Sequence, residues 1–205
     1  MSSTRAEAET LICRFLAADL PLFALQAWLL EADNGLDPAL STRLLALDWQ
    51  APELWSQLEA QLAAVLPAGK AQGWELQQLL SWILSAEPRA CWAVAQCQRL
   101  YSSGLRFLAP IAEAMDEGQL PNGFDWEPIR ALIPELAPAA ELLLHVLASG
   151  ELQLQAHGYL LEASTASLLE SQLESAQDWR RANQAIALWL DAHRHLVARP
   201  SEPGA

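Results

Sequence analysis

The sequence is short of the residues that favour β-structure and tight turns. Val, Ile and Thr are scarce beside Leu and Ala, and only 9 of the 205 residues are glycine. Leu and Ala are strong helix formers, whereas β-branched side chains favour strands. The composition therefore predicts an all-α protein. With 52% hydrophobic residues, the chain has enough apolar surface for a single core of this length.

Other absences argue against whole classes of protein. The three cysteines, Cys13, Cys91 and Cys97, are an odd number without a close pair, which favours buried thiols in a reducing cytoplasm over a disulfide framework. The N-terminus is polar and acidic, without the basic and apolar regions of a signal peptide. No run of residues approaches the roughly 18 apolar residues that a membrane span requires. We therefore expect a cytoplasmic protein without a membrane segment.

Basic residues are also few, since 12 Lys and Arg stand against 25 Asp and Glu for a formal net charge of −13. Acids outnumber bases along the whole chain. Such a charge repels phosphate groups, which argues against nucleic-acid binding, and it lacks the basic face that peripheral membrane proteins use. An acidic surface attracts a basic protein partner, although the same charge could serve solubility alone.

The sequence contains no motif for catalysis, phosphate binding or metal binding. GxSxG, Gly-rich phosphate loops and the ExxH of di-iron bundles do not occur. His193 and His195 are two residues apart, so on a helix they point in different directions, unlike the i, i+4 pair of a helical zinc motif. We therefore predict a non-enzymatic protein with no catalytic residue, cofactor or metal. A helical enzyme stays an alternative that a deep pocket with several shifted pKa values would support.

Proline, asparagine and glycine divide the chain into about ten predicted helices. Asn34-Gly35 is expected to end the second helix, and Asp37-Pro38 is expected to begin the third. The segment from Glu151 to about Val197 is expected to form two or three long helices, and no convincing strand is predicted. Further predicted boundaries are Asp19 as the cap of the second helix, a loop over 66–73, and Pro134 and Pro138 around the start of a new helix.

We expect these helices to form one compact domain over residues 1–198, a bundle built from antiparallel helical hairpins. The polar, turn-rich segment 117–128 is a candidate sub-domain boundary within it. Residues 199–205 are expected to be a disordered tail. The nine tryptophans mostly fall on apolar helix faces, so they are expected to fill the core, with Trp28 packed against Trp49. One or two of the tryptophans could instead be exposed anchors for a partner.

Acidic residues gather at two of the predicted breaks between helices. Paired carboxylates can perform acid/base chemistry, but in a chain with 25 acids they are more often solvated loop residues. Asp37 and Asp125 occupy positions of helix caps, so capping and solvation explain part of the pattern. The sharper interpretation is a docking surface for a basic protein. The candidate partner-binding residues are Glu31, Asp33, Asp48, Asp116, Glu117, Asp125 and Glu127.

One stretch of the N-terminal half has a recognisable pattern. A short helix leads into a hydrophobic–x–x–W–L helix, an acidic turn with Leu, and then L–L–x–hydrophobic–D–aromatic. The residues that match are Phe15, Leu16, Phe23, Trp28, Leu29, Leu36, Leu44, Leu45, Asp48 and Trp49, followed loosely by Leu100, Tyr101, Gly104, Leu105, Phe107 and Leu108. This pattern resembles that of the immunity proteins of bacterial polymorphic toxin and contact-dependent systems. Ala27 departs from it, because an acid or an aromatic residue is common before the Trp, and the half beyond residue 115 matches nothing.

The resemblance implies a cytoplasmic immunity protein that binds its toxin and blocks the active site or a required motion. An acidic inhibitor facing a basic toxin domain is physically coherent. The alternative is an all-α accessory chaperone for a redox-enzyme precursor or a secreted effector, because length, Leu/Ala/Trp content and acidity fit it as well. The Pro-Asp motif expected between the central helices of the redox-enzyme chaperones is missing, which argues against that kind.

Overall fold

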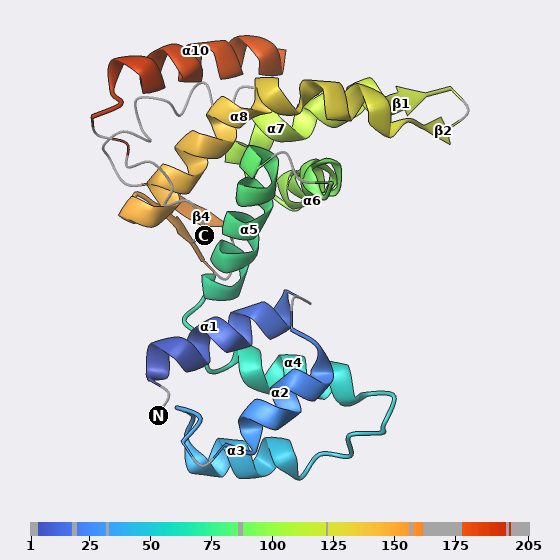
Figure 1. Ribbon diagram of the computed structural model, residues 1–205, viewed down its shortest axis with the longest axis vertical. Coiled ribbons are helices and arrows are strands. Elements are labelled where there is room, and N and C mark those ends of the chain that lie inside the picture. The colour runs from blue at the N-terminus through green and yellow to red at the C-terminus, as the bar shows by residue number, and fades with distance from the viewer. Residues whose placement is uncertain are drawn as a thin grey trace. The chain divides into compact units, whose positions relative to one another are not determined.

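The computed structural model describes residues 4–17, 20–31, 33–85, 88–121, 123–155, 158–161, 178–195 and 197. This part of the chain contains nine α-helices and two short hairpins, so the mostly helical character of the predicted all-α fold is confirmed (Figure 1). The chain divides into two compact units, which we call unit 1 (Met1–Glu75) and unit 2 (Leu76–Ala205). Each unit has its own cluster of buried apolar side chains.

Unit 1 consists of four helices and the beginning of a fifth. They are α1 (Arg5–Leu16), α2 (Leu22–Leu29), α3 (Pro38–Leu45), α4 (Leu54–Ala63) and α5 (Lys70–Ser85). Thr4 and Glu7 form a capping box at the start of α1, and Asp37 caps α3 by accepting two backbone N–H groups. The core is filled mainly by Phe15, Leu25, Leu29, Leu44, Leu58 and Leu62.

A buried asparagine organises the connection between α2 and α3. The Nδ2 group of Asn34 donates to the carbonyl of Leu29 (3.1 Å), and its Oδ1 accepts from the N–H of Leu36 (3.1 Å) and the hydroxyl of Ser41 (3.2 Å). The Asn34 side chain therefore satisfies one of the carbonyls that the end of α2 leaves open. Helix α2 ends at Leu29, earlier than the predicted Asn34-Gly35, whereas the start of α3 after Asp37 is confirmed.

Unit 2 is arranged around one long central helix. Its elements are α6 (Ala90–Ser102), η1 (Arg106–Leu108), α7 (Ala109–Ala112), η2 (Glu113–Gly118), β1 (Gln119–Leu120), β2 (Gly123–Phe124), α8 (Trp126–Ser149), β3 (Leu152–Leu154), β4 (Tyr159–Leu161) and α10 (Trp179–Ala192). Helix α8 contacts α6, α7, α10 and β3. Of the described helices, α8 is long and apolar enough to cross a membrane by length and composition, criteria that a buried core helix also meets. Its apolar residues fill the core of unit 2.

Both prolines that were expected to bracket a new helix lie inside α8, so that prediction is wrong. A proline removes one backbone N–H, and its ring displaces the carbonyl four residues earlier. Asn183 of α10 compensates in part, because it supplies an acceptor to the backbone of α8 beside the second proline. Its Oδ1 accepts from the N–H of Ala139 (3.1 Å), while its Nδ2 donates to the carbonyls of Pro110 (2.8 Å) and Trp179 (2.9 Å). Helix α8 continues through the prolines and changes direction along its length (Figure 1).

Two antiparallel hairpins occur where no strand was predicted. Strand β1 pairs with β2, and β3 pairs with β4 with Leu152 opposite Leu161. The second hairpin falls where a long helix was predicted to begin at Glu151, so that prediction is wrong for this segment. Gly150 ends α8 in the left-handed region (φ 81°), and β3 then buries Leu152 and Leu154 on one face, as a strand does.

The predicted single domain over 1–198, with its candidate boundary at 117–128, stays a prediction beside these two compact units. The chain divides near residue 75, because the apolar residues on either side of it join different clusters. The segment 117–128 lies within unit 2, where η2 and α8 are in contact across it. The predicted loop 66–73 is shorter, since α5 begins at Lys70. The predicted cap Asp19 and the tail 199–205 lie outside the described residues.

Replacing Asn183 tests the compensation across α7, α8 and α10. Asn183→Ala leaves a buried N–H of α8 and a buried carbonyl of α7 without their partner, so we expect a loss of about 2–4 kcal/mol of unfolding free energy. Urea denaturation measures this loss. Gln184→Ala, a change at the exposed neighbouring position, is the control and should stay within about 0.5 kcal/mol of the unchanged protein. Equal stability of the two variants would contradict this role.

Candidate partner-binding site

Three of the seven predicted acidic residues have local structural roles. The Oδ1 of Asp48 accepts from the N–H of Gln50 (3.0 Å) in the turn after α3. Asp125 is the N-cap of α8, as expected, and accepts from the N–H of Glu127 (3.0 Å). Asp116 accepts a longer bond (3.3 Å) from the side-chain amide of Gln119. The position of each of these carboxylates is explained by the turn or helix end that it stabilises.

Two further acids form ion pairs within unit 2. Arg180 binds Glu117 through both carboxylate oxygens (2.5 and 2.7 Å) and also contacts Glu135 (3.3 Å). The hydrogen bond from Arg180 lowers the pKa of the Glu117 carboxyl below its ordinary value of 4.5. Glu127 pairs with Arg130 (2.7 Å) one turn along α8. These two carboxylates are therefore already neutralised by cations of the same chain.

Glu31 and Asp33 differ from the other five. Both are exposed, and neither has a hydrogen-bond or ion-pair partner for its side chain among the residues that the structure describes. They follow the C-terminus of α2, where the helix dipole is negative and favours cations. Two acids at this end oppose the dipole, so helix stability does not explain them. They are the predicted site residues that remain available to a partner.

The helix that precedes these acids exposes apolar side chains. Leu25, Trp28 and Leu29 of α2 are buried in unit 1, whereas Phe23 is 74% exposed and Leu30 is 69% exposed. Ala27 lies between these two and is also exposed, and the spacing i, i+4, i+7 places the three on one face. We call Phe23, Ala27, Leu30, Glu31 and Asp33 the α2 surface.

The exposed apolar residues of α2 were not among the predicted site residues. The available signal was the apolar character of LFALQAWL on all sides, since such a helix is normally buried on all sides. A short helix at the surface of a unit of four helices cannot be covered all round. The α2 surface therefore joins three outward apolar side chains to two acids that have no partner in the described part of the chain.

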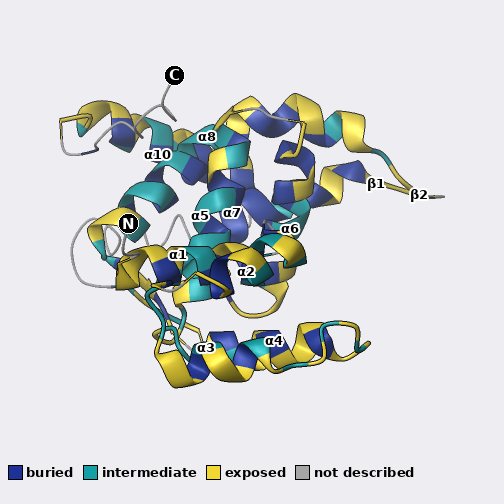
Figure 2. Cartoon of the chain, turned by 60° about the horizontal axis from the view of Figure 1, so that its bottom comes forward, coloured by how far each residue is buried: buried dark blue, intermediate teal, exposed yellow. Residues whose placement is uncertain are grey.

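A second exposed apolar group surrounds the hairpin of β1 and β2, which Figure 2 shows as largely exposed. Leu120, Phe124 and Trp126 are 53%, 40% and 42% exposed, and the rings of Phe124 and Trp126 meet edge to face with centroids 4.8 Å apart. Gly118 allows the Phe124 ring to pack closely, since a Cβ at this position would lie 2.5 Å from the ring. We call Leu120, Phe124 and Trp126 the hairpin arm. The predicted acids near it are those described above, which form ion pairs or stabilise a turn or a helix end.

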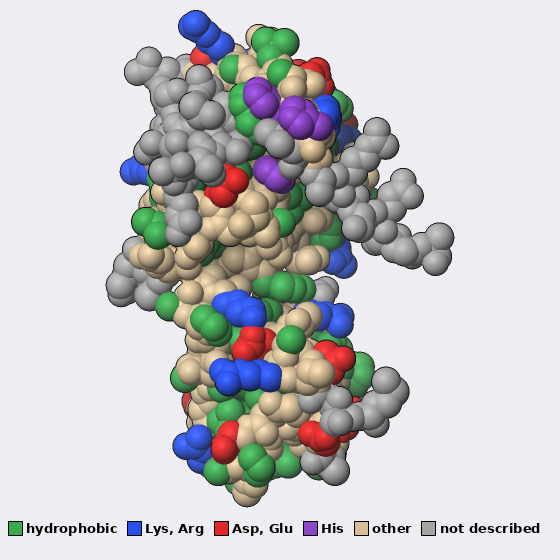
Figure 3. Space-filling view, turned by 90° about the vertical axis from the view of Figure 1, so that its left-hand side faces the viewer, with side chains coloured by type: hydrophobic (Ala, Val, Ile, Leu, Met, Phe, Trp, Pro, Cys, Tyr) green, Lys and Arg blue, Asp and Glu red, His purple; other side chains and the backbone are tan. Residues whose placement is uncertain are grey.

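The net charge of −13 does not form one acidic patch on the face in Figure 3, where acidic and basic side chains are interspersed. Histidine side chains gather on this face of unit 2. The ring of one histidine of this unit, His193, stacks on Trp189 with centroids 4.4 Å apart. Within the described residues, no group of three His, Cys, Asp or Glu side chains is placed to hold a metal ion. The candidate site is thus a small surface of mixed character.

Comparisons with protein-family models, with curated proteins and with solved structures find no match to this chain. The α2 surface is therefore inferred from its own geometry and from the sequence pattern.

The ion pair of Glu117 and Arg180 has a measurable consequence. Because its folded pKa is lowered, Glu117 contributes stability that is present above its unfolded pKa and is lost as the pH falls through the folded pKa. Arg180→Gln should raise the pKa of Glu117 towards 4.5 and, since water screens both groups, should change the stability little at pH 7. Side-chain carboxyl NMR titration measures the pKa. Arg181→Gln makes the same charge change one residue away and should leave the Glu117 pKa unchanged; an equal effect would contradict the pairing.

Proposed function

We propose that this protein is a non-enzymatic binding protein that docks a basic protein partner on the α2 surface. The observation that carries the proposal is an exposed apolar stripe that ends at two carboxylates with no partner among the described residues. Protein interfaces combine a few large apolar anchors with a polar rim, and rim charges steer a partner of opposite sign. Phe23 and Leu30 supply the anchors, and Glu31 and Asp33 supply the rim charge.

Within this class, we propose an immunity protein that binds and neutralises a cognate bacterial toxin in the cytoplasm. The pattern that resembles immunity proteins includes α2 and its continuation to Trp49, so the resemblance and the exposed surface fall on the same segment. Toxin domains that act on nucleic acid are commonly basic, and such an acidic inhibitor would associate rapidly with them. We also propose that the whole chain forms about ten helices, arranged as antiparallel hairpins.

Co-expression tests the proposal directly. The product of the neighbouring gene should be toxic to the host cell when expressed alone, and this protein should restore growth and co-purify with it as a stable complex. A neighbouring product that is harmless alone would overturn the immunity function. Co-purification without toxicity would leave a binding protein of another kind.

Changing the α2 surface should weaken the complex without unfolding the protein. Glu31→Gln with Asp33→Asn removes two negative charges, and Phe23→Ala removes the aromatic anchor; we expect each variant to lose on the order of tenfold in affinity. Glu59→Lys, at an exposed position of α4, changes the net charge by the same two units and is the matched control. Calorimetric titration gives the affinities, and urea denaturation checks the fold. Equal loss in the Glu59→Lys variant would mean that net charge, not the α2 surface, is recognised.

The hairpin arm supports a second candidate function, an accessory chaperone. Leu120, Phe124 and Trp126 are exposed together, and large exposed apolar side chains can hold an apolar segment of a client. A chaperone of this kind should bind a synthetic signal-like peptide with a basic start and an apolar run. The immunity function requires no such binding, so a saturable titration that Trp126→Ala weakens would favour the chaperone.

A further inference from the structure

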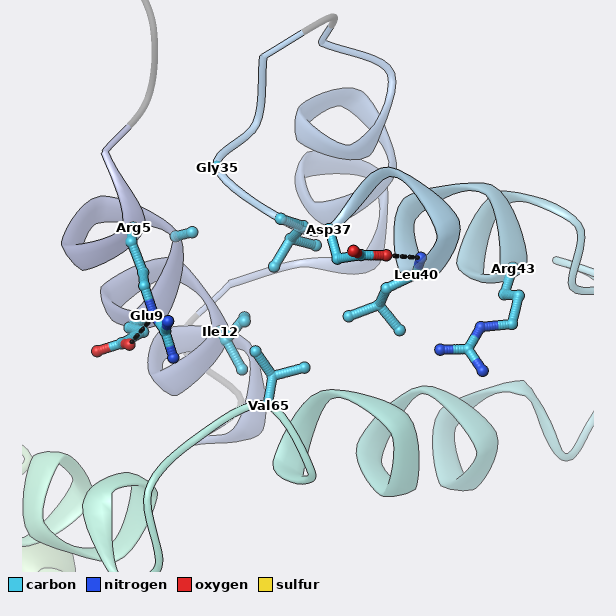
Figure 4. A pocket seen from close by; sticks show the side chains of 10 residues that line it. Arg5, Glu9, Ile12, Gly35, Asp37, Leu40, Arg43 and Val65 are labelled. Atoms are coloured by element: carbon cyan, nitrogen blue, oxygen red, sulfur yellow. Dashed lines mark hydrogen bonds and ion pairs between the residues drawn. The ribbon is translucent and has the colours of Figure 1, made fainter.

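Unit 1 contains a pocket of about 320 Å³ that the α2 surface does not include (Figure 4). It lies between α1, the start of α3 and the turn after α4. This volume falls within the range of about 300–1,000 Å³ that is usual for small-molecule sites. The floor and walls are apolar, and the rim carries both signs of charge. The apolar lining is Ala8, Ile12, Leu36, Leu40 and Val65, and the charged rim is Arg5, Glu9, Asp37 and Arg43.

Basic residues gather at this pocket although unit 1 is acidic. Residues 1–75 include 10 Asp and Glu but only 4 Lys and Arg. Two of these four bases, Arg5 and Arg43, line the pocket, and a third, Lys70, pairs with the lining residue Glu9. The concentration of cations at one place in an acidic unit points to an anionic ligand.

The acids at the rim are already engaged. Glu9 accepts from Arg5 (3.1 Å) and from Lys70, and these hydrogen bonds lower its pKa, so its single charge faces two cations. The Oδ1 of Asp37 accepts the N–H groups of two residues in the first turn of α3 (2.9 and 3.1 Å), where the helix dipole favours a carboxylate. Neither acid therefore needs a cationic ligand for its charge.

Arg43 differs from the other charged residues of the rim. In the described part of the chain, no hydrogen-bond or ion-pair partner contacts its guanidinium. Figure 4 shows its side chain extending from α3 with the guanidinium turned towards the side of the pocket where Leu40 and Val65 lie. A guanidinium beside an apolar surface can bind a planar carboxylate through two parallel hydrogen bonds.

We propose that this pocket binds a carboxylate carried on a short apolar chain. Arg43 pairs with the carboxylate, and Ile12, Leu40 and Val65 contact the chain. A phosphate dianion fits less well, because the oxygens of Glu9 and Asp37 on the same rim repel a second negative charge, and the apolar floor has no donor for it. The same chemistry is present in a free short-chain carboxylic acid and at the C-terminus of a peptide that ends in an aliphatic residue.

Methyl NMR titration of the full chain tests the proposal, with hexanoate as the probe. We expect saturable shifts of the Ile12, Leu40 and Val65 methyl groups. Acetate, which lacks the chain, and hexanamide, which lacks the charge, should bind at least about tenfold more weakly. Arg43→Gln should weaken hexanoate binding by a similar factor, whereas Arg14→Gln, the same charge change at a base of unit 1 that does not line this pocket, should leave it unchanged. Because Arg43 is exposed, its replacement should preserve the fold, which urea denaturation checks.

A second pair of probes distinguishes the two sources of the carboxylate. The peptide probe is acetyl-Ala-Leu with a free C-terminus, and its control is the same peptide as the amide. If the free peptide binds more tightly than hexanoate and the amide does not bind, the pocket is assigned to peptide C-termini. Tighter binding of hexanoate assigns it to free carboxylic acids. Absence of saturable shifts with both probes, an equal response to hexanamide, or unchanged binding in Arg43→Gln overturns the proposal. These outcomes are independent of partner docking, since the α2 surface shares no residue with the pocket.

Discussion

The buried amide of Asn183 is the contact on which the packing of unit 2 depends. Two prolines interrupt the hydrogen-bond ladder of α8, and the short α7 leaves a carbonyl open, yet one side chain from α10 satisfies a group on each helix. Since an unsatisfied buried backbone group costs about 1–3 kcal/mol, the continuous α8 depends on this amide. Asn34 has a similar role in unit 1, where its side-chain amide satisfies the Leu29 carbonyl at the end of α2. In each unit, a buried side-chain amide thus satisfies backbone groups at the end of a helix or beside a proline.

A helix boundary could be predicted from the sequence when the interaction that sets it lies within a few residues. Asp37-Pro38 begins α3 as predicted, because a cap and a proline at the first helical position act within four residues. Pro134 and Pro138 were misjudged because the group that accommodates them, Asn183, lies 44 residues away from Ala139 in the sequence. The hairpin of β3 and β4 was missed because strands of three residues offer too short an alternation to separate from a helix.

In the candidate site, the sequence likewise does not show which acids are paired with distant bases. Sequence positions identified the seven acids, and Asp125 was recognised as a cap, but Glu117 is neutralised by a base 63 residues away. No local pattern reveals such a pair. Glu31 and Asp33 were predictable as acids without a structural role, because the helix end beside them disfavours negative charge. The exposure of Phe23 and Leu30 was not predictable, since periodicity identifies an apolar face without showing whether another element covers it.

The α2 surface breaks two local rules at once, and this coincidence is what makes it the stronger candidate. Apolar side chains point outward, and two acids stand at the negative end of a helix dipole. In an exposed setting, each such acid destabilises the helix by about 0.3–1 kcal/mol. Proteins retain such conflicts mainly at functional sites. A partner with an apolar ridge bordered by cations would relieve both together, so its binding would stabilise unit 1 by mass action. The hairpin arm breaks only the first rule, because the acids beside it are already paired or capping, and it therefore lacks the charge that would select a basic partner.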